Sequence, residues 1–111
     1  MAAKRKREIA TVEYGPDHEY ELVFIVSPEV VEEALENAIN GVSQFVTSKG
    51  GTVSQVEQWG KRRLAYPLKR FLEGNYVLTK FKMRPQWSKE LEANLQISEN
   101  ILRHLLVKIG D

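Results

Sequence analysis

The stretch YELVFIVSPEVVEEALENAINGVSQFVTSKGG, residues 20–51, decides the fold because its hydrophobic period changes partway along. Residues 20–26 are rich in aromatic and β-branched side chains and stop at Ser27-Pro28, which predicts a strand. Beyond the proline, apolar side chains recur every three or four residues on one stripe, which predicts a helix. The stripe consists of Val31, Leu35, Ala38, Ile39, Val42 and Phe45.

Both ends of this helix carry sequence signals. Ser27 is expected to cap it, with Pro28 at its first position and acidic side chains near its positive end. Gly50-Gly51 predicts a left-handed stop after Lys49. We therefore expect a helix of about six turns at 3.6 residues per turn.

The rest of the chain predicts three more strands and a second helix. Residues 52–68 read as a strand with a bulge near Gly60, and Pro67 places this strand at a sheet edge. Residues 71–74 are expected to form a hairpin loop, followed by a strand over residues 75–84. Ser88 then begins a short helix, and residues 100–109 form the last strand.

The resulting order is β-α-β-β-α-β, which predicts an α+β, ferredoxin-like split fold. A four-stranded antiparallel sheet would carry two helices on one face and leave the other face uncovered. Residues 19–110 are expected to form this domain. Residues 1–18 lack periodicity, contain the turn signal Gly15-Pro16-Asp17, and are expected to form a flexible N-terminal arm.

Composition narrows the class of protein. The 111 residues contain no cysteine, which excludes disulfides and thiolate metal sites and fits a reducing cytosol. No apolar run is long enough for a membrane span, and no apolar h-region follows the basic start of the chain. We expect a soluble, cytoplasmic protein.

Charge is segregated along the chain. Residues 8–48 contain nine acids and no Lys or Arg, whereas residues 49–89 contain ten bases and only two acids. This pattern indicates one surface for a polyanion and one solvated acidic surface, with chance clustering as the alternative.

The uncovered sheet face is the first candidate binding surface. Strand alternation places Val23, Ile25, Tyr76 and Leu78 on it beside Lys80 and Lys82, so we expect this face to be both apolar and cationic. In the last strand Leu105, Val107 and Ile109 alternate with His104, Leu106 and Lys108, so either face of that strand adds apolar side chains. A contiguous apolar patch favours a protein-binding face. Scattered surface apolar residues, or a misplaced helix, would give the same pattern.

A basic cluster in the second strand is the second candidate. Lys61, Arg62, Arg63, Lys69 and Arg70 are interleaved with Trp59, Tyr66 and Phe71, a combination that favours RNA. Charges that protect an edge strand from aggregation are the alternative. Residues 73–81, EGNYVLTKF, do not match the base-stacking pattern of RNA-recognition motifs.

Catalysis has little support in the sequence. His18 is expected to be solvated in the arm, and His104 to be a structural strand residue without a catalytic partner. No metal-ligand spacing and no phosphate-binding glycine loop occurs, so we expect no enzyme, no metal and no cofactor.

The segment WGKRRLAY, residues 59–66, closely resembles the most characteristic segment of the bacterial ribosomal protein S six (S6) family of the small subunit. Tyr20-Glu21-Leu22, Gly74-Asn75-Tyr76 and residues 101–108 also resemble family segments. The resemblance covers residues 19–109, nearly the whole domain.

This resemblance implies a structural component of the small ribosomal subunit that binds the central domain of small-subunit ribosomal RNA together with ribosomal protein S eighteen (S18). It implies neither a membrane nor a small-molecule substrate. By position, the residues implied for contact with RNA or partner are Arg62, Arg63, Tyr66, Arg103 and Lys108, then Tyr20, Tyr76 and Leu78; the basic cluster adds Lys69 and Arg70.

Two departures from the family and two rival functions remain. The arm is longer than usual and contains the basic run 4–7, and the chain stops at Asp111 where many members carry a charged tail that helps to dock the partner. The main rival is a ligand-sensing or oligomerising ferredoxin-like module that pairs its open face with itself. A small acylphosphatase-type hydrolase ranks last because residues 26–29 offer an acid instead of glycines and an arginine.

Overall fold

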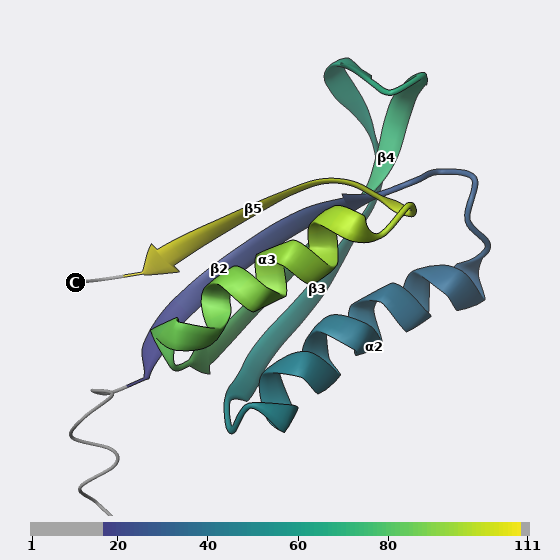
Figure 1. Ribbon diagram of the computed structural model, residues 1–111. Coiled ribbons are helices and arrows are strands. Elements are labelled where there is room, and N and C mark those ends of the chain that lie inside the picture. Colours follow the sequence, from purple (N-terminus) through teal and green to yellow (C-terminus); the bar gives the residue numbers. More distant parts are fainter. Residues whose placement is uncertain (1–16, 110–111) are drawn as a thin grey trace, which may run out of the picture.

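The computed structural model describes residues 17–109, which form a four-stranded antiparallel sheet with two helices on one side (Figure 1). The elements in order are β2 (His18–Val26), α2 (Glu32–Ser48), β3 (Thr52–Leu68), β4 (Phe71–Met83), the short 3-10 helix η1 (Pro85–Trp87), α3 (Ser88–Ile97) and β5 (Ile101–Ile109). The strand order β3-β4-β2-β5 is that of the predicted ferredoxin-like split fold, and this prediction is confirmed.

The N-terminal boundary differs slightly from the expected one. β2 begins at His18, the last residue assigned to the arm, whereas residues 1–16 of that arm lie outside the described residues. Within residues 17–109, no helix combines the length and apolar character needed to cross a bilayer.

The core lies between the sheet and the helices, as strand alternation predicts. The register pairs Leu22 with Thr79 and Phe24 with Val77, so these side chains share the helix-facing side. They pack with buried residues of both helices, among them Ile39, Val42, Val46, Leu91 and Leu95. Burial of this apolar face against α2 and α3 stabilises the fold and leaves the opposite face open.

The predicted start of α2 is wrong. The helix begins at Glu32 rather than after Ser27, and its N-cap Val31 is exposed and makes no side-chain cap hydrogen bond. The Ser27 hydroxyl instead accepts a hydrogen bond of 3.2 Å from the Glu29 amide, and the Ser27 amide donates to the Asn100 carbonyl at 2.8 Å. Ser27 therefore closes a local turn at the sheet end, as serine side chains readily do.

The other end of α2 follows the prediction. The helix ends at Ser48 with Lys49 as its C-cap, and Gly50 adopts the left-handed conformation with φ of +82°. Glycine adopts this conformation without the steric penalty of a Cβ atom.

The β3–β4 hairpin is longer than predicted and projects beyond the two helices (Figure 1). Its turn is at Lys69-Arg70, not at residues 71–74, which belong to β4 and pair with β3. The loop prediction was wrong because Lys69 takes a left-handed conformation, with φ of +58°, that glycine usually provides. The predicted bulge is confirmed by a register shift before Gly60, and Pro67 does lie on an edge strand.

Candidate functional site

The open face of the sheet is apolar near the base of the hairpin, as predicted. Val23, Ile25, Tyr76 and Leu105 line a hollow of about 200 Å³ there, together with Arg103. Leu105 is 56% exposed, and Val107 and Ile109 continue the exposed apolar row along β5. This half of the face is a continuous patch with no covering element among residues 17–109.

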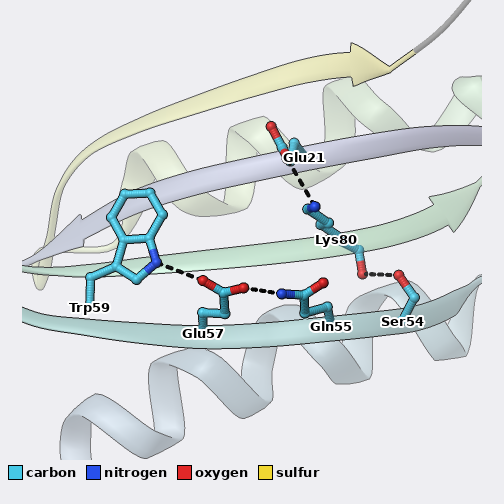
Figure 2. Close-up of polar contacts among 6 residues, drawn as sticks. All are labelled: Glu21, Ser54, Gln55, Glu57, Trp59 and Lys80. Atoms are coloured by element: carbon cyan, nitrogen blue, oxygen red, sulfur yellow. Dashed lines mark hydrogen bonds and ion pairs between the residues drawn. The ribbon is translucent and has the colours of Figure 1, made fainter.

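The other half of the open face carries paired charges. Lys80 Nζ lies 3.5 Å from a Glu21 carboxylate oxygen, and Lys82 Nζ lies 3.8 Å from Glu19 (Figure 2 shows the first pair). The two lysines were expected to make the face cationic. Their acidic partners offset this charge, so the open face is less basic than its lysines suggest.

Trp59 stands at the junction of the open face and the hairpin, held by hydrogen bonds. Its indole Nε1 donates to Glu57 Oε1 at 2.9 Å, and Gln55 donates to the other oxygen of the same carboxylate (Figure 2). The indole ring stacks on Tyr76 with centroids 6.4 Å apart, and the Arg62 guanidinium lies 5.4 Å from the indole centroid. The three side chains therefore form an ordered stack that directs the Arg62 charge towards the open side.

A second contact joins the hairpin to the opposite edge of the sheet. Arg103 Nη1, on β5, donates a hydrogen bond of 2.6 Å to the Tyr66 hydroxyl, on β3. These strands are the two edges of the sheet, so the contact forms where the hairpin, beyond the last pairing of β4 with β2 at Asn75, reaches over to β5. Because the acceptor is a neutral hydroxyl, Arg103 is oriented while its charge stays uncompensated.

The basic residues of the hairpin differ in their partners. Arg70 is paired with Glu29, nitrogen to oxygen 3.4 Å, and its guanidinium also lies over the Phe71 ring. Among residues 17–109, Lys61, Arg63 and Lys69 have no carboxylate partner within ion-pair distance. The hairpin thus presents cations that can meet an anion without first breaking an internal ion pair.

The predicted contact residues do not all share one surface. Arg62 pairs with Gly74 and Arg63 with Glu73, so the two arginines point to opposite sides of the hairpin. Lys108 is opposite Tyr20 in the register and therefore lies on the helix-facing side, away from the open face. The structure brings together Arg62, Tyr66, Tyr76 and Arg103 and separates them from Lys108.

Two predicted contact residues are buried. Tyr20 is 6% exposed and stacks on Phe81 in the core, so little of its side chain is accessible for contact with RNA or a partner. Its burial raises the pKa of its phenol, and a hydrogen bond with Ser88 partly opposes this effect. Leu78 does face the open side but is only 7% exposed.

The two histidines lie on strands. His18 is in β2, not in the arm, with its ring 6.2 Å from that of Tyr20. His104 faces the helices, where its Nε2 lies 3.4 Å from a Glu92 oxygen. Within residues 17–109, no three potential metal-ligating side chains gather into a cluster.

Comparisons with known proteins agree on one family. Residues 19–108 match the family model described as "Ribosomal protein S6". The small ribosomal subunit protein bS6 of Moorella thermoacetica is 40% identical over 92 residues, which cover 83% of this chain and 94% of that protein. The bS6 protein of Clostridioides difficile is 44% identical over 88 residues, covering 79% and 95%.

A solved structure supports the same relationship. The crystal structure of 30S ribosomal protein S6 from Thermotoga maritima superposes with a TM-score of 0.79 at 32% sequence identity. The match covers 83% of this chain and 87% of that one. Sequence and fold therefore point to the same relatives.

Proposed function

This chain belongs to the ribosomal protein S6 family of the small ribosomal subunit, and from that premise we propose that it binds the central domain of small-subunit ribosomal RNA jointly with ribosomal protein S18. In this role it is a structural component of the cytoplasmic ribosome rather than an enzyme. The observation that carries the proposal is the pairing of an uncovered apolar sheet face with a projecting cationic hairpin.

The hairpin supports RNA binding through its charge. Between residues 59 and 75 the chain has five bases and one acid, and Arg70 alone of these bases is engaged with a carboxylate among the described residues. Electrostatic attraction to phosphates supplies most of the sequence-independent affinity for RNA. Because the hairpin projects past the helices, a nucleic-acid backbone can approach it from more than one side.

The open face supports a protein partner. Leu105, Val107 and Ile109 form an exposed apolar row on an edge strand, beside the hollow lined by Val23 and Ile25. Apolar side chains in such a hollow typically carry most of the binding energy of an interface, surrounded by a polar rim. The ion pairs Glu19–Lys82 and Glu21–Lys80 provide that rim.

The small number of free cations predicts cooperation between the two proteins. A few phosphate contacts give weak, strongly salt-dependent binding when the chain is alone. A partner on the open face would add its own contacts with RNA, and the joint complex would bind much more tightly. The expected result is an RNA affinity at least tenfold higher with S18 than without it.

Filter binding of central-domain RNA with each protein alone and with both together tests this. Leu105→Asp places a charge in the apolar row and should remove the S18-dependent gain, since loss of a central anchor costs about 2 kcal/mol or more, roughly thirtyfold. Ile97→Asp is the matched control, because Ile97 is 78% exposed but lies on α3, on the helix-covered side.

Equal RNA affinity with and without S18 would contradict the proposal. Sedimentation of the chain alone provides an independent measurement. A stable homodimer at micromolar concentration, without preference for RNA, would instead favour the self-pairing module.

A further inference from the structure

A hollow of about 320 Å³ lies between the tip of the hairpin and the start of β5. Three segments far apart in the sequence line it: Lys69 in the turn, Leu95 and Gln96 at the end of α3, and residues 101–104 on β5. No carboxylate is part of this lining. The hollow is therefore a feature of the tertiary structure with only cationic and neutral walls.

Arg103 lines this hollow as well as the hollow on the open face, so its positive charge lies where the two meet. Its Nη1 is held by the Tyr66 hydroxyl at 2.6 Å, which orients the guanidinium without neutralising it. The remaining guanidinium N–H groups can still donate to another acceptor. His104 adds no comparable charge, because its Nε2 is engaged with Glu92 at 3.4 Å.

Lys69 supplies the second positive charge, from a strained position. It is the one residue other than glycine with positive φ among residues 17–109, at +58°. A side chain in the left-handed region costs about 1–2 kcal/mol relative to glycine. Strain of this kind is typically retained where the side chain has a function.

The neighbouring Arg70 provides a contrast. Its guanidinium is paired with Glu29 at 3.4 Å on the other side of the turn. Lys69 has no ion-pair partner within residues 17–109. Of these two adjacent cations, Lys69 lines the hollow and has an unpaired charge, whereas Arg70 is not part of the lining.

We propose that this hollow binds one phosphate group of the RNA backbone, with Lys69 and Arg103 as its ligands. The inference rests on the proposed RNA-binding function and assigns a site within it. A guanidinium donates two parallel hydrogen bonds to phosphate oxygens, and an ammonium adds a mobile point charge. Tyr66 acts as a positioning residue that holds the arginine in place.

The test compares two variants that each remove one positive charge at the turn. Lys69→Gly keeps the left-handed backbone and removes the charge in the hollow, whereas Arg70→Gln removes the charge that Glu29 already engages. Binding of central-domain RNA by the full chain with S18 is measured between 50 and 200 mM salt. One phosphate contact changes the slope of log affinity against log salt by about 0.7–0.9.

The expected result is a slope reduced by about 0.7–0.9 for Lys69→Gly and unchanged for Arg70→Gln. Lys69→Arg keeps a positive charge at this position, so its slope should equal that of the natural chain. Tyr66→Phe should weaken binding while the slope stays close to that of the natural chain, because Arg103 keeps its charge but loses its orientation.

Equal slopes for Lys69→Gly and Arg70→Gln would overturn the assignment. The two charges would then act alike on the RNA at long range, and no specific phosphate contact by Lys69 would be needed. Weaker association of Lys69→Gly with S18 in the absence of RNA would also overturn it, because the hollow would then hold a carboxylate of the partner. Absence of RNA binding by the unmodified chain with S18 would instead refute the proposed function itself.

Discussion

Thr79→Val should stabilise this protein, although the substitution lies in the middle of the core. Thr79 is fully buried on the helix-facing side of β4, opposite Leu22 on one neighbouring strand and Val56 on the other. Among the residues that the structure describes, its hydroxyl oxygen has no hydrogen-bond partner. A buried hydroxyl without a partner is an unfavourable group that an apolar replacement removes.

The expected gain in the free energy of unfolding has two contributions. An unpaired buried polar group costs about 1–3 kcal/mol, and the new methyl group contributes roughly 0.8 kcal/mol of apolar burial. Imperfect fit of the new methyl offsets part of this gain. We expect a net increase of about 1–2 kcal/mol in the free energy of unfolding, which raises Tm by roughly 5–10 °C in a domain of this size.

Urea unfolding followed by circular dichroism, with Tm from calorimetry, measures the effect. Thr52→Val is the matched control: it makes the same chemical change at an exposed position of β3 and should change stability by no more than about 0.5 kcal/mol. Thr79→Ser keeps the hydroxyl, loses a buried methyl group and should destabilise by about 1 kcal/mol. A Thr79→Val variant as stable as the natural chain, or less stable, would refute the reasoning.

The adjacent glycines after α2 should respond differently to alanine, as urea unfolding can measure. Gly50→Ala should lower the free energy of unfolding by about 1 kcal/mol, because φ is +82° but the surrounding space is open. Gly51→Ala should lower it by about 3 kcal/mol, because the new Cβ would overlap the Lys82 carbonyl oxygen. Equal losses for the two variants would contradict this reasoning. Because burial raises the folded-state pKa of Tyr20 above its usual 10.0, the unfolded chain loses this proton first, and stability should fall as pH rises above about 10. Tyr20→Phe should lose less stability between pH 9 and 11 than the natural chain does, and parallel losses for both proteins would contradict the assignment.

Most of the fold was predictable because the hydrophobic pattern is local and agrees with the cap and turn residues. The alternation in β2, the stripe of α2 and the stop at Gly50 each follow from a few neighbouring side chains. The start of α2 was not predictable in this way. Ser27 and Pro28 are typical of a helix start, but the contact of the Ser27 amide with Asn100, far along the chain, keeps this residue at the sheet end.

The site was only partly predictable from the same information. Sequence alternation correctly assigned the open face and placed Lys80 and Lys82 on it, but only the folded sheet shows their pairing with Glu21 and Glu19. The resemblance suggested Tyr20 as a contact residue, and the register instead places it in the core against Phe81.

By itself the sequence determined the order of strands and helices, the apolar character of the uncovered face and the concentration of basic residues in the β3–β4 hairpin. These features depend on side-chain periodicity and on charges within single segments. Tertiary structure alone decided that Arg70 is paired, because folding brings it to Glu29, and that Arg103 is oriented with its charge still available, because folding brings it to Tyr66. Both contacts need their atoms within hydrogen-bonding distance, and they join residues about forty positions apart, so they form only once the chain has folded.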